Sequence, residues 1–94
     1  MELVNKELLL LEKKLMSFVV NRTDIGIHYR CNDTIIRESF VLDNYVVSET
    51  TLHLFGDWFQ ITVKSKITNV LFDEDEDVIY VEFSDGTEIN IEIY

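Results

Sequence analysis

Apolar residues at the start of the chain follow the spacing of an α-helix. Steps of four, three, four and three residues separate Val4, Leu8, Leu11, Leu15 and Phe18. This spacing places them on one face and predicts a helix from about Leu3 to Val20 that packs against the rest of the protein. Apolar residues also lie off this face, among them Leu9, Leu10 and Met16. They are either scattered exposed side chains or a second contact surface for a dimer.

Beyond Asp24 the apolar period changes to two, which is typical of strands. The predicted strand segments are Ile25–Cys31, Ile35–Leu42, a short Tyr45–Val47, Leu52–Phe55, Trp58–Val63, Ile67–Phe72, Val78–Phe83 and Glu88–Ile93. A helix followed by closely spaced strands indicates the α+β class, with an antiparallel meander of six or seven short strands. We expect one domain over residues 1–94: a helix at about 3–20, then a β-rich part at 25–94 that forms a curved sheet or small barrel.

The last hairpin has a predictable register. Its apolar residues share one parity on both strands, so the loop between them must hold an odd number of residues. A three-residue loop, Ser84–Gly86, places Gly where a left-handed residue is needed. That register pairs Val81 with Ile89. It also sets Glu82 opposite Glu88, an unfavourable pair of like charges that suggests a function other than folding.

Charge is distributed unevenly along the chain. All eight Lys and Arg residues lie at or before Lys66, whereas residues 67–94 carry nine acids and no base. A net charge of −10 without a basic cluster argues against direct nucleic-acid binding and favours a basic protein partner. The amino-terminal segment has neither the clean apolar run of a membrane span nor that of a signal peptide, so we expect a cytoplasmic protein.

The densest acidic feature is the run Asp73, Glu74, Asp75, Glu76 and Asp77. Its first, third and fifth residues fit a calcium-binding loop, but Val78 and Ser84 stand where that loop requires Gly and Glu. Two interpretations remain: a solvated hairpin loop that discourages aggregation, or an acidic docking surface.

The sequence contains no recognisable motif for binding a metal or a cofactor or for catalysis, so we expect no such site. His28 and Cys31 have opposite parity in one predicted strand, so they cannot bind the same metal or form a nucleophilic pair. Cys31 is better interpreted as a small buried apolar residue. We therefore predict a non-enzymatic protein.

Apolar residues near the acidic run suggest an interface. Val70, Phe72, Val78 and Tyr80 have the parity opposite to the inner Ile79, and together they would form an apolar strip edged by acids. If the sheet closes under the helix, the strip belongs to the core instead. Trp58 is interpreted as a core or rim aromatic, or alternatively as an exposed anchor for a partner.

These features lead to one expected function and two alternatives. The first is a small acidic interaction protein, such as an inhibitor encoded by a phage or mobile element, that blocks a basic or nucleic-acid-binding surface of its target. Its candidate binding residues are Asp73, Glu74, Asp75, Glu76, Asp77, Glu82, Glu88, Val70, Phe72 and Tyr80. The alternatives are a homo-oligomeric structural or regulatory module, such as a homodimer, and a ligand-sequestering protein or hydrolase with its site between protomers.

Overall fold

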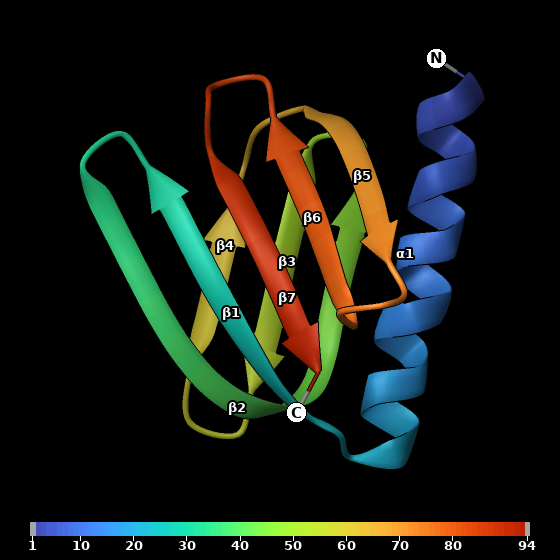
Figure 1. The fold of residues 1–94 in the computed structure, drawn as a ribbon, viewed down its shortest axis with the longest axis vertical. Coiled ribbons are helices and arrows are strands. Elements are labelled where there is room, and N and C mark those ends of the chain that lie inside the picture. The colour runs from blue at the N-terminus through green and yellow to red at the C-terminus, as the bar shows by residue number, and fades with distance from the viewer. Residues whose placement is uncertain (1, 94) are drawn as a thin grey trace.

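One helix and seven strands make up the fold (Figure 1). A computed structural model describes residues 2–93, with side chains from residue 6 onward. The elements are α1 (Glu2–Asn21), β1 (Asp24–Cys31), β2 (Thr34–Ser48), β3 (Thr51–Gly56), β4 (Gln60–Val63), β5 (Ile67–Asp73), β6 (Val78–Phe83) and β7 (Glu88–Ile93). All strand pairs are antiparallel, in the order β4-β3-β2-β1-β7-β6-β5. The predicted α+β meander is confirmed, and the sheet is curved and unclosed.

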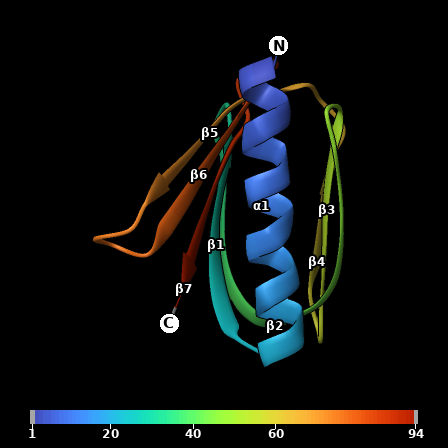
Figure 2. The ribbon, with the colours of Figure 1, turned by 90° about the vertical axis from the view of Figure 1, so that its right-hand side faces the viewer.

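Strand β2 differs from its prediction. We expected two strands, Ile35–Leu42 and Tyr45–Val47, with Asp43 and Asn44 as a turn between them, but β2 is a single 15-residue strand. A bulge between Leu42 and Asn44 bends it without interrupting it. The first half of β2 pairs with β1, and the second half pairs with β3. The bend therefore folds the sheet into two layers, β5-β6-β7-β1 on one side and β3-β4 on the other (Figure 2).

Helix α1 lies along the opening between the two layers, where it packs against β2 and β5 (Figure 2). Its predicted apolar face is confirmed where side chains are described, because Leu8, Leu11, Leu15 and Phe18 are all buried. The rest of the core comes from the inner faces of both layers: Ile25, Ile27, Phe40, Leu42, Leu52, Leu54, Val63, Ile67, Val70, Ile79, Val81, Phe83, Ile89 and Ile91. Val4 lies outside the residues with described side chains.

The register predicted for the last hairpin is confirmed. Val81 lies opposite Ile89, and Glu82 lies opposite Glu88. The backbone N–H of Gly86 donates to the carbonyl oxygen of Phe83 at 3.1 Å, and Gly86 has a φ of 92°. This conformation favours glycine, which explains why the loop carries one at this position.

Candidate partner-binding surface

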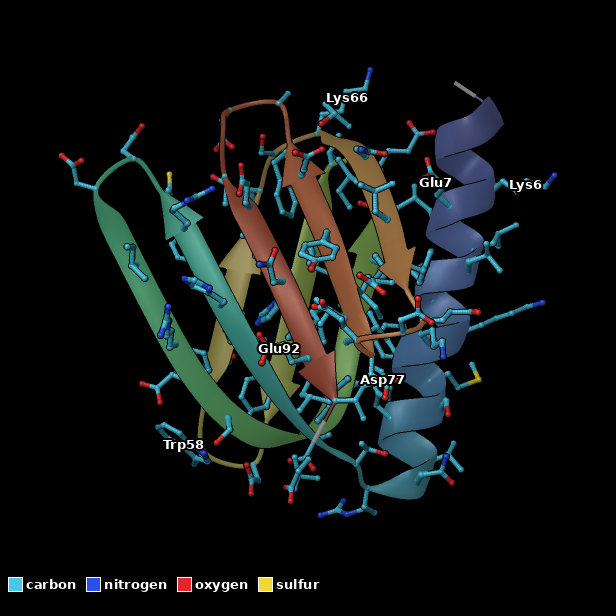
Figure 3. The ribbon with its side chains drawn as sticks, viewed as in Figure 1. Lys6, Glu7, Trp58, Lys66, Asp77 and Glu92 are labelled. Carbon is cyan, nitrogen blue, oxygen red and sulfur yellow. The ribbon has the colours of Figure 1, made fainter. Side chains whose placement is uncertain are left out.

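The acidic run forms the turn between β5 and β6, and we call Asp73–Asp77 the acidic loop. Figure 3 shows Asp77 beside the helix. Asp73 Oδ1 accepts hydrogen bonds from the backbone N–H groups of Asp75 at 3.1 Å and Glu76 at 3.2 Å. Asp77 adopts a left-handed φ of 54°. Local backbone contacts therefore shape the loop, and residues 74–77 remain exposed.

Two members of the predicted apolar strip do not lie on the surface. Val70 is buried, with 2% of its surface exposed, and pairs with the core residue Val81. Phe72 pairs with Ile79 and is half-buried against the core. The prediction that Val70 and Phe72 share a face with Tyr80 is therefore wrong.

The faces of Val70 and Phe72 were assigned wrongly because of the length of the acidic loop. Asp73 lies opposite Val78, which leaves four residues in the turn. Because directly opposed residues share a face, an even-numbered turn places the odd residues of β5 with the even residues of β6. Leu71 therefore lies opposite Tyr80 on the outer face, and 53% of its surface is exposed. Sequence reasoning missed Leu71, since parity alone does not reveal the length of an acidic turn.

Leu71 and Tyr80 border an open hollow of about 550 Å³ next to the acidic loop. Its lining consists of Leu71, Phe72, Asp73, Glu74, Asp75 and Tyr80. Carboxylates therefore surround a small apolar floor that includes one phenol ring. This combination suits the side chain of Arg or Lys, whose apolar stem and charged end need different surroundings.

Glu82 and Glu88 are opposed as predicted, but each has a separate polar partner. Glu88 Oε1 accepts a hydrogen bond from Arg30 Nη2 at 2.6 Å on the adjacent strand β1. Glu82 Oε1 accepts one from Asn69 Nδ2 at 3.0 Å on β5. These contacts turn the two carboxylates towards opposite neighbours and relieve the like-charge contact, so the pair does not by itself indicate a function.

The acidic residues predicted to bind a partner form two groups. Glu82 and Glu88 lie at the end of the outer face next to the last hairpin loop, and the acidic loop lies at the other end of β6. Glu82 lies four residue steps from Val78, which is about 13 Å along a strand. The uncharged Tyr80 and Asn90 lie between them. Since this separation exceeds the screening length of about 8 Å at physiological salt, the two groups act separately.

Two bases of α1, Lys13 and Lys14, lie near the acidic loop. The ion pairs found among the described side chains are Arg22 with Asp43 at 3.4 Å and Arg30 with Glu88 at 2.6 Å. Lys13 and Lys14 of α1 line a hollow together with Glu74, but neither forms an ion pair with it. Within the described part of the chain, the loop thus keeps its negative charge available to a partner.

The histidines and the cysteine lie apart. His28 is on the outer face of β1, opposite Arg37 and Asn90, whereas Cys31 has the inner parity and is half-buried. Burial, together with a hydrogen bond to Cys31, raises the pKa of the Tyr29 phenol. His53 lies on β3, stacked on Phe55 with ring centroids 3.7 Å apart. Over residues 2–93, no three His, Cys, Asp or Glu residues are grouped as metal ligands.

None of the known family models matches the chain, and neither a characterised protein nor a solved structure is significantly similar to it. Among the described residues, no helix is both long enough and apolar enough to cross a membrane. The function is therefore inferred from the surface of the protein.

Proposed function

We propose that this chain is a non-enzymatic binding protein that holds a basic protein segment in the hollow beside the acidic loop. The observation that supports the proposal is the lining of that hollow, where Leu71 and Tyr80 lie next to the carboxylates of Asp73, Glu74 and Asp75. An exposed apolar pair alone, or an exposed acidic loop alone, would be ordinary surface. Their combination in one concave place is what favours a specific partner.

An Arg or Lys side chain fits this lining well. Its apolar stem would cover Leu71, while its charged end would contact the ring of Tyr80 and the carboxylates of Glu74 or Asp75. Hydrogen bonds between a cation and a carboxylate are among the stronger polar contacts in proteins. Arg fits better than Lys, because its planar guanidinium can stack on an aromatic ring and bind two carboxylate oxygens at once.

The target we propose is a protein that uses such basic side chains to bind nucleic acid. Carboxylates at the acidic loop would take the place of phosphates and block that surface. The net charge of −10 supports this proposal because it speeds encounter with a basic target and repels nucleic acid. An inhibitor encoded by a phage or mobile element would have this role.

The proposal is tested with an Arg-rich peptide of ten residues, followed by amide chemical shifts at 50 and 300 mM salt. We expect shifts at Leu71, Tyr80 and the acidic loop, with affinity falling at the higher salt concentration because exposed charges are screened. The test variant is Glu74→Gln/Asp75→Asn. Its matched control is Asp33→Asn/Glu49→Gln, which removes the same charge from exposed turns at the other end of the molecule.

Only the test variant should lose affinity, by about tenfold if one charge-assisted contact is lost. Equal losses in both variants would mean that the peptide responds to net charge alone, and this would contradict the proposed site. A Lys-rich peptide of the same length should bind more weakly than the Arg-rich one if stacking on Tyr80 contributes.

A further inference from the structure

The first half of β2 is an edge of the sheet (Figure 1). Between Thr34 and Glu38, β2 pairs with β1 on one side, and no strand of the described chain pairs with its other side. We call this segment the free edge. Backbone groups of alternate residues in a strand face opposite neighbours, so half of the N–H and C=O groups in the segment are directed outward.

The next residues of the same edge show which groups face outward. The Asp57 N–H donates to the carbonyl oxygen of Val41 at 3.0 Å, and the Val41 N–H donates to Asp57 Oδ1 at 3.3 Å. Trp58 Nε1 donates to the carbonyl oxygen of Ser39 at 3.0 Å. The turn between β3 and β4 thus forms hydrogen bonds with the outward backbone groups of Ser39 and Val41, but it does not extend to residues 34–38. By alternation, Ile35 and Arg37 are the residues of the free edge whose backbone groups face outward.

We propose that the free edge pairs with the free edge of a second copy of this chain, antiparallel and centred on Ile36. Ile35 of one copy then lies opposite Arg37 of the other, and the two pairs exchange about four backbone hydrogen bonds. Ile36 lies opposite Ile36 of the second copy on the inner face. Shifting the centre to Arg37 would oppose two arginines and require the carbonyl of Ser39, which Trp58 already occupies.

The same register gives Trp58 a partner. Ser39, whose carbonyl accepts the Trp58 indole N–H, falls opposite Asp33 of the second copy, so the ring would lie against the turn formed by Asn32 and Asp33. In the single copy, 62% of Trp58 and 59% of Ile35 are exposed. Ile35 is part of the free edge and Trp58 lies at its margin, so pairing would cover much of this apolar area.

Charge favours a second copy at this edge over one at the helix. The free edge carries Arg37 and Glu38, which cancel, and Trp58 at its margin is far from Asp77 in Figure 3. Two copies that each carry −10 can therefore meet here with their acidic loops apart. The exposed helix residues Leu9 and Met16 are worse placed, since α1 lies directly beside the acidic loop.

The contact is small, because each copy contributes five paired residues, whereas a standard interface has about 20–30 residues on each side. We therefore expect weak association, with dimers forming at protein concentrations of about 0.1–1 mM. Sedimentation equilibrium should show the mass rising from 11.1 kDa towards twice that value. Trp58 is the sole tryptophan, so its emission should shift to shorter wavelength over the same range. Amide exchange at Ile35 and Arg37 should slow as concentration rises.

The test variant is Arg37→Pro, which removes an outward N–H at an edge where proline is tolerated. Its matched control is Thr62→Pro, which removes an outward N–H from β4, a strand at one end of the sheet. Arg37→Pro should stay monomeric and Thr62→Pro should dimerise like the wild type. A wild-type chain that stays at 11.1 kDa, whether or not a strand of another protein binds the edge, overturns the proposal. Concentration-independent exchange at Ile35 and Arg37 overturns it too, even if Arg37→Pro fails to fold.

Discussion

The ring of Phe40 packs directly on Gly56, in the space that a side chain at position 56 would occupy. An added Cβ atom would overlap the ring and would lie 2.6 Å from the carbonyl oxygen of Phe59. Gly56 also donates its backbone N–H to that oxygen at 2.7 Å. Because Phe40 comes just before the bend of β2, this contact holds the turn between β3 and β4 against the bend.

We predict that Gly56→Ala lowers the free energy of unfolding by about 1–3 kcal/mol, since the core must shift to admit the methyl group. Phe40→Ala also destabilises, but it removes Cγ and Cδ2 of the ring, the atoms that the new methyl group meets. The double variant should therefore be more stable than the sum of the single changes predicts. Urea denaturation of the four proteins measures this coupling, and strict additivity would contradict the packing argument.

Arg30 on β1 binds the Glu88 carboxylate on the side away from Glu82. We predict that Arg30→Gln lowers the free energy of unfolding by about 0.5–1 kcal/mol at low salt, because both partners are partly exposed and the two carboxylates then face each other. The loss should shrink as salt is added. Adding Glu82→Gln should restore most of the stability. Thermal unfolding at 20 and 500 mM salt tests this, and a salt-independent loss would point to packing of the Arg30 stem instead.

The sequence predicts the helix and the last hairpin well, for a physical reason. The apolar face of α1 repeats over four turns, so a single misplaced residue hardly affects it. In the last hairpin, apolar parity and Gly86 both require the same three-residue loop. Where two independent constraints agree, the register follows from the residues alone.

Elsewhere the local signals are ambiguous. Asp43-Asn44 resembles a turn, but a bulge uses similar residues and bends β2 without ending it. The acidic loop offers no glycine to fix its length, so the faces of Val70 and Leu71 could not be assigned. Trp58 is held in place by a hydrogen bond to the carbonyl oxygen of Ser39, which is 19 residues away in sequence. This contact exists only in the folded protein.

Asp85 makes the last hairpin sensitive to acid. Its Oδ1 accepts a hydrogen bond from the backbone N–H of Thr87 at 2.9 Å, which lowers the pKa of the Asp85 carboxyl below its usual value. A lowered pKa means that the folded state favours the carboxylate. The stability it contributes is therefore present above the usual Asp pKa and is lost as pH falls through the lowered value.

We predict that the wild type is more stable than Asp85→Asn near neutral pH, and that this difference shrinks below about pH 4. Chemical denaturation of both proteins from pH 2 to 7 measures it. A difference that stays constant with pH would mean that ionisation of Asp85 does not contribute.

The neighbours Val70 and Leu71 provide a direct test of the corrected face assignment. Val70 is 2% exposed and Leu71 is 53% exposed, although both lie in the middle of β5. Val70→Ser should lower the free energy of unfolding by about 2–4 kcal/mol, because it leaves a cavity and buries a hydroxyl. Leu71→Ser should change it by less than about 0.5 kcal/mol.

Leu71→Ser should instead weaken binding of the Arg-rich peptide, since the apolar floor of the hollow is lost. If Leu71→Ser were the more destabilising change, the register across the acidic loop would be wrong. If it left peptide binding unchanged at normal stability, Leu71 would not belong to the binding surface.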